Sequence, residues 1–279
     1  MILPADRLLF GTAGVPRSSQ GTSTLSGIRC IAEMGLDCLE IEFVQGVKMG
    51  TSTASQIGDE AKKKKVALSV HAPYHINLNS PEEGKFLASQ ERILTSARLA
   101  KISGARSVVF HPGYYRKGRP RDEAFDNIKK GIKEVLSILR TERNPVILRP
   151  ETMGKKTQFG SLEETLFLCR ELEGLQPCID FSHIHAREGK INSYLEFLRI
   201  LKKIEKKLGS GSTSNMHIHI SGAMYNEKGE MKHLNLIESD FRYDEWIQAL
   251  RDFDVKGMVI CESPDQEGDA MMLKKLFYG

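Results

Sequence analysis

Short apolar runs alternate with segments of helical periodicity along the whole chain. Eight runs of four to six residues occur, at positions 8–11, 38–43, 66–70, 107–110, 145–149, 177–180, 216–220 and 257–261. Helical patterns follow them, most clearly over residues 81–103, 121–140 and 191–207. Short strands separated by helices are typical of βαβ units with a parallel sheet. Eight units predict an α/β fold that closes into a (β/α)8 TIM barrel.

The chain shows no sign of division into several domains. Its 279 residues suit one α/β barrel, and no linker or shift in composition interrupts the alternation. We therefore predict a single TIM-barrel domain over residues 1–279. The irregular stretch 208–215 is rich in Gly and Ser, and we expect it to be a flexible loop before the seventh strand.

Composition restricts the cellular setting. Five scattered cysteines without a CxxC pair argue against a disulfide framework and for a reducing compartment. The first residues lack the apolar core of a signal peptide, and no apolar run reaches the length of a membrane span. We expect a soluble cytoplasmic protein. The net charge of +4 permits an anionic partner without requiring one.

Potential metal ligands lie at the ends of six consecutive apolar runs, the third to the eighth. They are His71, His111, Glu151, Asp180, His219 and Glu262. The carboxyl ends of barrel strands converge on one face, so these side chains should meet there. Imidazole and carboxylate groups bind zinc and similar divalent metals, and clustered carboxylates repel one another without a cation. The pattern predicts a metal centre with more than one ion.

Each of these residues has a simpler explanation when it is considered alone. A histidine after a strand is often only hydrogen-bonded, and Asp180 or Glu262 could cap the following helix. The six together favour a ligand set. His217 lies two residues before His219 and faces the same side of its strand, so we expect it to support the ligands from a deeper position.

Two further pairs could hold an additional ion. His183 and His185 follow Asp180 closely, and Glu230 and His233 are three residues apart. The alternative for each pair is an ordinary polar surface.

Seven short motifs occur in an order that is specific as a set. They are HAPYHINL (71–78), FHPG (110–113), PET (150–152), CIDFSH (178–183), HISG (219–222), KHLNLIE (232–238) and CESPD (261–265). With them the chain resembles the endonuclease IV family of apurinic/apyrimidinic endonucleases, in the xylose-isomerase-like barrel group. The motifs cover nearly the whole chain.

The resemblance implies three zinc ions, with Mn²⁺ or another divalent metal as the alternative. His71, His111 and Glu151 would hold the first ion. Glu151 would bridge to a second ion completed by Asp180, His219 and Glu262, and His183 and His233 would bind the third. The family has an Asp two residues before this last His, where this chain has Met231. Glu230 is the expected replacement, and the alternative is an ion held by two histidines and water.

The resemblance also implies an activity and a partner. A monomeric enzyme would hydrolyse the phosphodiester 5′ to an abasic site in double-stranded DNA and leave a 3′-hydroxyl. Glu151 and Glu262 would be the catalytic carboxylates, with Glu262 orienting or deprotonating the attacking water.

The same resemblance, with the basic composition of one loop, suggests contacts to DNA. Arg116, Lys117 and Arg119 follow His111 in YYRKGRPR (114–121), and Tyr74 could enter the duplex at the lesion. Lys48 is the one cation where the family has a DNA-penetrating loop, near residues 43–50. The alternatives are a solvated loop and simple packing of the tyrosine. The run KKKK (62–65) should end a helix at the opposite face.

Two other functions remain open from the sequence. A sugar isomerase or epimerase uses the same barrel, usually with one metal and acid–base groups. A non-catalytic DNA-binding or scaffold protein would keep the barrel without activity. The additional histidines His71, His111, His183 and His233 favour the nuclease.

Overall fold

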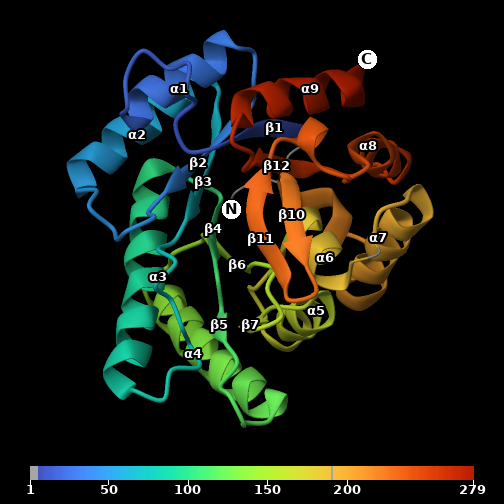
Figure 1. Ribbon diagram of the computed structural model, residues 1–279. Helices are drawn as coiled ribbons and strands as arrows, with labels where there is room; N and C mark the ends of the chain where they lie inside the picture. The colour runs from blue at the N-terminus through green and yellow to red at the C-terminus, as the bar shows by residue number, and fades with distance from the viewer. Residues whose placement is uncertain (1–5, 190) are drawn as a thin grey trace.

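Eight parallel strands form the centre of the computed structural model, which describes residues 6–189 and 191–279 (Figure 1). Each strand contains most or all of one predicted apolar run. In their order around the sheet they are β6 (Ile147–Pro150), β4 (Ser107–Phe110), β3 (Ala67–His71), β2 (Cys38–Glu42), β1 (Leu8–Ala13), β12 (Gly257–Cys261), β9 (Met216–Ile220) and β8 (Cys178–Asp180).

The two outer strands of this order, β6 and β8, meet and close the barrel. Parallel bridges join Leu148 to Leu175 and Glu151 to Cys178. The Thr152 N–H donates to the Cys178 carbonyl at 3.1 Å, as does the Gln176 N–H to the Leu148 carbonyl. The predicted (β/α)8 TIM barrel is confirmed.

Helices surround the barrel, and those expected from periodicity are present. They are α1 (Thr24–Glu33), α2 (Thr51–Lys64), α3 (Glu83–Ser103), α4 (Arg121–Thr141), α5 (Leu162–Glu171), α6 (Phe181–Glu188), α7 (Tyr194–Leu208), α8 (Tyr243–Asp252) and α9 (Gln266–Tyr278). On α7 the buried residues are Phe197, Ile200, Leu201 and Ile204, a spacing that forms one apolar stripe. The lysine run 62–65 ends α2 before β3 begins, as predicted.

The prediction of a flexible loop over residues 208–215 is wrong in part. Residue Leu208 still belongs to α7, and a short 3₁₀ helix, η1 (Ser212–Asn215), follows. The Ser212 N–H and hydroxyl both donate to the Gly209 carbonyl, at 3.1 and 2.7 Å. Small polar residues support such tight turns as readily as an open loop, so composition alone does not separate the two.

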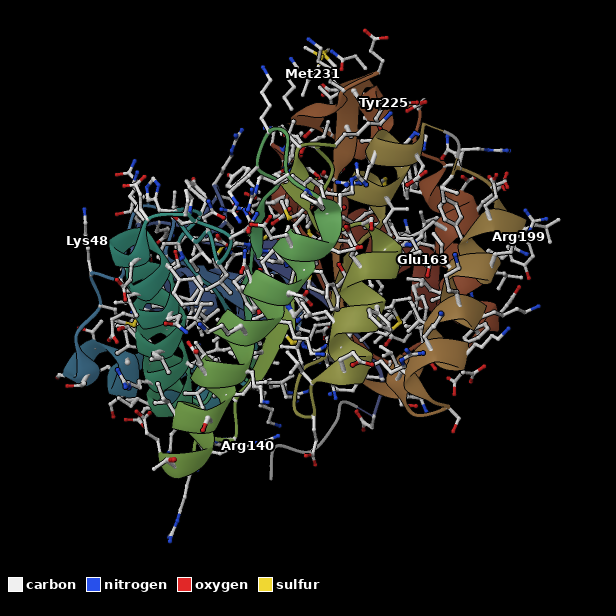
Figure 2. The ribbon with its side chains drawn as sticks, turned by 90° about the horizontal axis from the view of Figure 1, so that it is seen from below. Lys48, Arg140, Glu163, Arg199, Tyr225 and Met231 are labelled. Carbon is white, nitrogen blue, oxygen red and sulfur yellow. The ribbon has the colours of Figure 1, made fainter. Side chains whose placement is uncertain are left out.

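Two small antiparallel pairs lie in the segments that follow β4, β6 and β9. One joins β5 (Gly113–Tyr114) to β7 (Gln158–Phe159), and the other is a hairpin of β10 (Gly222–Asn226) and β11 (Gly229–Leu234). These segments leave the carboxyl ends of barrel strands, so both pairs belong to the face where the predicted ligands converge. The hairpin projects from the barrel in Figure 2, where Tyr225 and Met231 lie at its outer edge. Neither pair was predicted from the sequence.

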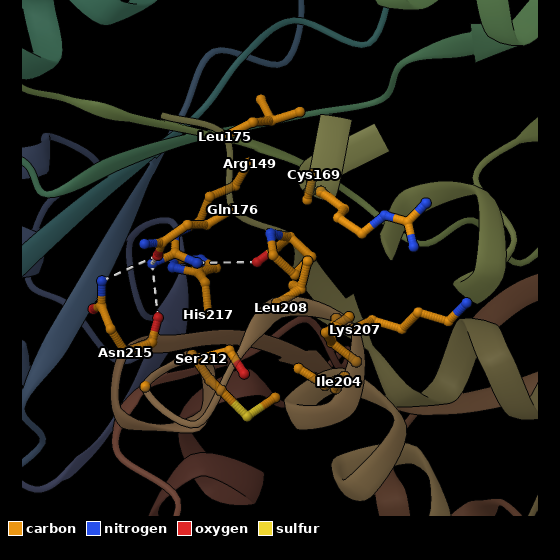
Figure 3. Close-up of a pocket in the computed structure, with 15 residues that line it drawn as sticks. Arg149, Cys169, Leu175, Gln176, Ile204, Lys207, Leu208, Ser212, Asn215 and His217 are labelled. Carbon is orange, nitrogen blue, oxygen red and sulfur yellow. Dashed lines mark hydrogen bonds between the residues drawn. The ribbon is translucent and has the colours of Figure 1, made fainter. Parts of the chain in front are cut away.

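The opposite end of the barrel is held by Arg149, a buried residue of β6. Its guanidinium donates to the carbonyls of Pro177 and Asn215, at 3.0 and 2.9 Å, and to the Gln176 side chain at 3.0 Å (Figure 3). It therefore ties β6 to the starts of β8 and β9. A cavity of about 360 Å³ adjoins it. Within the described residues, no helix is long and apolar enough to cross a membrane.

Candidate metal centre

Glu151 occupies the middle of a cluster of histidines and carboxylates, and each of its oxygens faces a different group. Its Oε2 lies 3.3 Å from His71 Nε2 and 3.0 Å from His111 Nε2. Its Oε1 lies 3.1 Å from His183 Nδ1 and 3.6 Å from His219 Nδ1. The side chain is 1% exposed. A carboxylate arranged in this way can serve two metal positions at once.

Asp180 and Glu262 complete the group on the Oε1 side. His219 Nδ1 lies 3.2 Å from Glu262 Oε1, and one donor atom from each of Glu151, Asp180, His219 and Glu262 lies within 4.8 Å of the others. Asp180 also caps α6, because its Oδ1 accepts from the His183 N–H at 2.7 Å. Its Oδ2 has no hydrogen-bonding partner in the part of the chain that the structure describes. The cap and the ligand role expected from sequence thus use different oxygens.

A third group of donors lies between α6 and the hairpin. Glu230 reaches His183 Nε2 at 3.4 Å with Oε2, and His233 Nε2 at 3.2 Å with Oε1. His183 Nδ1 lies 2.9 Å from the Thr152 carbonyl, which fixes the ring so that Nε2 faces Glu230. All three residues anticipated for an additional ion therefore converge.

A β-bulge explains how Glu230 reaches this group. In the hairpin Met224 pairs with Lys232 and Tyr225 pairs with Glu230. Met231 is therefore an extra residue that pairs with no residue of β10. In a regular strand, residues two apart face the same side, and position 231 would accompany His233. The inserted residue turns Glu230 to that side instead and leaves Met231 exposed.

The donor set fits divalent cations. Among the described residues, the buried atoms without a hydrogen-bonding partner include Glu151 Oε1, Asp180 Oδ2 and His219 Nδ1, which face the cluster. Two ligands of one tetrahedral zinc ion lie roughly 3.3 Å apart when metal–ligand bonds are about 2.0 Å. The separations of 3.0 to 3.6 Å around Glu151 bracket this value. Imidazole and carboxylate donors suit zinc and related metals.

The buried carboxylates of the cluster need positive charge beside them. Burial alone would lower the pKa of His71, but its hydrogen bond with Glu151 and the charge of Glu42 raise that pKa to about 10. Burial raises the pKa of Asp180 to about 6. Protons on the histidines balance the carboxylates in the protein alone, and a divalent cation would compete with them, so metal binding should weaken as pH falls.

Strand β2 contributes two acids that sequence analysis missed, Glu40 and Glu42. Glu40 is fully buried beneath the cluster. Glu42 lines a cavity of about 230 Å³ together with His71 and His111, and burial raises its pKa to about 8. The signal was present in CLEIEF, where two acids stand two residues apart in an apolar run and must face the same side. His217 lies deeper than His219 and contacts Glu40, in the supporting position expected for it.

His185 does not join the cluster. Its Nε2 lies 3.2 Å from Asp240 Oδ1, and its ring packs edge-on against Tyr225, with centroids 4.9 Å apart. The residues of a helix point in successive directions, so His183 and His185 diverge. The hypothesis that these two histidines hold an ion as a pair is therefore wrong.

The residues expected to contact DNA differ in exposure, in ion pairing and in distance from the metal centre. Tyr74 is 43% exposed and lines the same cavity of about 230 Å³ as His71 and His111, here called the metal cavity. Its ring lies nearly parallel to that of His111, with ring centroids 6.4 Å apart. Arg116 and Arg119 both form ion pairs with Glu123, whereas Lys117 is exposed. Lys48 is exposed but lies far from the hairpin in Figure 2.

Comparisons with known proteins agree with the fold and with an enzyme of the xylose isomerase-like superfamily. A family model described as xylose isomerase-like TIM barrel matches residues 28–276. An uncharacterized protein of Methanocaldococcus jannaschii is 45% identical over 271 residues, which is 97% of each chain. A probable endonuclease 4 of Aquifex aeolicus is 30% identical over 167 residues, and the match spans 58% of each chain.

Solved structures match over nearly the whole chain. A D-tagatose 3-epimerase-like protein has a TM-score of 0.74 at 21% identity, covering 96% of this chain and 95% of that one. Endonuclease IV from Thermus thermophilus has a TM-score of 0.72 at 16% identity, covering 97% and 98%. At these identities the likenesses concern the fold alone. With the sequence relatives, they confirm the predicted resemblance to endonuclease IV proteins.

The position of Glu230 leads to a prediction about metal content. Replacing Glu230 with Ala should lower the number of ions per chain by one, from an expected three towards two, because His183 and His233 alone bind an ion more weakly. Metal analysis after dialysis measures this. Glu227→Ala, an exposed acid at the turn of the same hairpin, is the control and should keep every ion. Full retention of metal in Glu230→Ala would make Glu230 a surface residue only.

Proposed function

The chain belongs to the family of xylose isomerase-like TIM barrels, and we propose that it is a metal-dependent phosphodiesterase of the endonuclease IV type. It would act as a monomer on double-stranded DNA, cleave 5′ to abasic sites and leave a 3′-hydroxyl. The observation that carries the proposal is the arrangement around Glu151, whose two oxygens face two donor groups, with a third group at His183, Glu230 and His233. Three adjoining metal positions suit phosphoryl chemistry better than sugar chemistry.

The residues of the cluster have distinct tasks in this proposal. Divalent ions held there would lower the pKa of a water molecule and neutralise phosphate oxygens. Glu262 borders the cavity and its side chain is 14% exposed, so it can orient an attacking water and accept its proton. Glu151 is buried and keeps the two donor groups at a fixed separation. His111, with 19% of its side chain exposed, lies where the substrate would approach.

A basic surface beside the cluster supports a nucleic-acid substrate. Four exposed lysines, here called the hairpin lysines, lie on the hairpin and on the loop that docks against it: Lys155, Lys156, Lys228 and Lys232. The Lys156 N–H donates to the Lys228 carbonyl at 3.2 Å, which holds loop and hairpin together. None of the four has an ion-pair partner among the described residues. They can therefore neutralise backbone phosphates more freely than Arg116 and Arg119, which share Glu123.

A sugar epimerase is the second candidate, favoured by the fold likeness and by Glu42. Epimerisation needs acid and base groups near one metal, and Glu42 lines the metal cavity with a pKa of about 8. Such an enzyme has no evident use for the third donor group or for Lys156, Lys228 and Lys232, which do not line the cavity. An assay for epimerisation of ketoses separates the two functions.

An incision assay tests the proposal directly. The metal-loaded protein should cut a duplex that carries one abasic site, and a chelator should abolish cutting. Glu151→Gln should reduce the rate by at least about 100-fold, because one oxygen of the bridge becomes a poorly ligating amide group. Glu163→Gln, whose 58% exposed side chain pairs with Lys203, is the matched control and should cut normally. Ketose conversion without incision would refute the proposal.

The hairpin lysines should dominate the salt dependence of DNA binding. Changing all four to Ala should lower the slope of log affinity against log salt by about 0.9 for each phosphate that the protein no longer neutralises. The triple change of Arg116, Lys117 and Arg119 to Ala should have a smaller effect, since two of those cations already pair with Glu123. Replacing Lys62, Lys63 and Lys64, at the other end of the barrel, should leave the slope unchanged. Equal slopes in all variants would exclude this surface.

Tyr74 should act on the lesion rather than on the fold. It is half-exposed beside His111, and an abasic site lacks one stacked base, so an aromatic side chain enters with less resistance. Tyr74→Ala should reduce discrimination between abasic and intact duplexes while the free energy of unfolding changes little. Competition binding and denaturant unfolding measure the two quantities. A large loss of stability with unchanged discrimination would show that Tyr74 serves packing.

A further inference from the structure

Glu40 is a buried carboxylate that accepts hydrogen bonds directly beneath the metal centre. It lies on β2, inside the barrel, and is fully buried. Its Oε2 accepts from the Ser69 hydroxyl at 2.7 Å and lies 2.9 Å from His217 Nε2. Its Oε1 lies 2.8 Å from His219 Nε2. An ionised carboxylate only accepts hydrogen bonds, so the groups around it must act as donors.

The two ring nitrogens of His219 face opposite ways. Nδ1 faces the metal centre, 3.2 Å from Glu262 Oε1 and 3.6 Å from Glu151 Oε1. Nε2 faces Glu40. A neutral imidazole carries its proton on one nitrogen and can bind a metal only through the other. The position of that proton therefore decides whether His219 can be a ligand.

We propose that Glu40 is a positioning residue that keeps the proton of His219 on Nε2 and so reserves Nδ1 for the metal ion shared with Asp180 and Glu262. The inference rests on the proposed function only in requiring a metal at this centre. Partners of this kind on metal-binding histidines set ring orientation and ligand basicity, and their loss typically costs about 10- to 100-fold in metal affinity.

The surroundings of Glu40 keep it charged although it is buried. The Ser69 hydroxyl and His217 Nε2 hydrogen-bond to its Oε2, and His219 Nε2 lies 2.8 Å from its Oε1. Arg149 lies deeper in the barrel, close enough for its charge to act on Glu40. A buried carboxylate is tolerated when it is hydrogen-bonded and its charge is balanced. The single negative charge also adds to the attraction for cations above it.

An additional ion inside the barrel is the competing explanation. Donor atoms of Cys178, His217 and His219 lie within 4.8 Å of one another, and Glu40 contacts both histidines. The 2.9 Å contact between Glu40 Oε2 and His217 Nε2 is a hydrogen bond, and Glu40 Oε1 lies only 2.8 Å from His219 Nε2. Ligands that share one zinc ion lie farther apart, roughly 3.3 Å. The geometry therefore favours direct contact between Glu40 and the two rings over an ion held between them.

Glu40→Gln is the main test. The Gln carbonyl should face the two donors Ser69 and His217, which leaves its amide N–H groups towards His219. His219 then has to place its proton on Nδ1 and loses its metal-binding nitrogen. We expect the affinity for one ion per chain to fall about 10- to 100-fold, measured by chelator competition with Co²⁺, and the visible absorption of that Co²⁺ ion to change.

Two controls separate positioning from structure. Ser69→Ala removes one hydrogen bond to Glu40 but leaves His219 in place, so it should keep metal affinity near that of the wild type. Unfolding of the metal-free proteins reports any purely structural effect. A Glu40→Gln protein that is destabilised without metal yet binds every ion normally would overturn the proposal. So would an extra ion that disappears in Cys178→Ala.

A measurement on the wild type makes the test independent of folding in the variant. Proton–nitrogen correlation spectra of the zinc-loaded protein, with labelled histidine, show which ring nitrogen carries the proton. We expect His219 to carry it on Nε2, and a proton on Nδ1 would refute the proposal. None of these measurements uses DNA. Absence of incision would therefore refute the proposed function and leave this inference standing, and the reverse also holds.

Discussion

Repulsion among buried carboxylates is the constraint on which the site depends. Closure of the barrel places Glu40, Glu151 and Asp180 in its interior, all at most 1% exposed, with Glu42 and Glu262 just above them. Such a set is compatible with a folded chain only if positive charge accompanies it. Histidines from β3, β9 and α6 supply that charge when protonated, and divalent metals would supply it in the proposed enzyme.

The barrel itself holds only part of the centre. Strand ends position His71, Glu151 and His219 through the regular ladder, in which residues of neighbouring strands stay in register. The third donor group needs irregular structure. His183 lies in the first turn of α6, and the bulge at Met231 turns Glu230 inward. Bulges often re-aim side chains near functional sites, and here the bulge accounts for a departure of one residue from the family pattern.

The sequence predicted the barrel well because its signals are local and repeated. Each apolar run became one barrel strand, and the residues that follow the runs met at one face because parallel strands share a direction. Glu40 and Glu42 were not predicted as site residues. The sequence does not show which side of the strand faces the barrel interior, and an acid inside an apolar run is not a clear signal without that knowledge. The ion pairs of Arg116 and Arg119 with Glu123 could not be foreseen either. They depend on how a loop folds against the first turn of α4.

The same barrel serves nucleases and sugar epimerases, so the features that separate the two must lie outside the shared scaffold. In this chain they gather on one side of the centre. Glu230 and His233 come from the hairpin, and the hairpin lysines surround them without ion-pair partners among the described residues. Lys155 lines the cavity itself, and a small neutral sugar in that cavity would gain nothing from the other three, which do not line it. A polyanion that extended past the proposed metal positions would gain from each of them, so under the proposed function the hairpin is the element that selects the substrate.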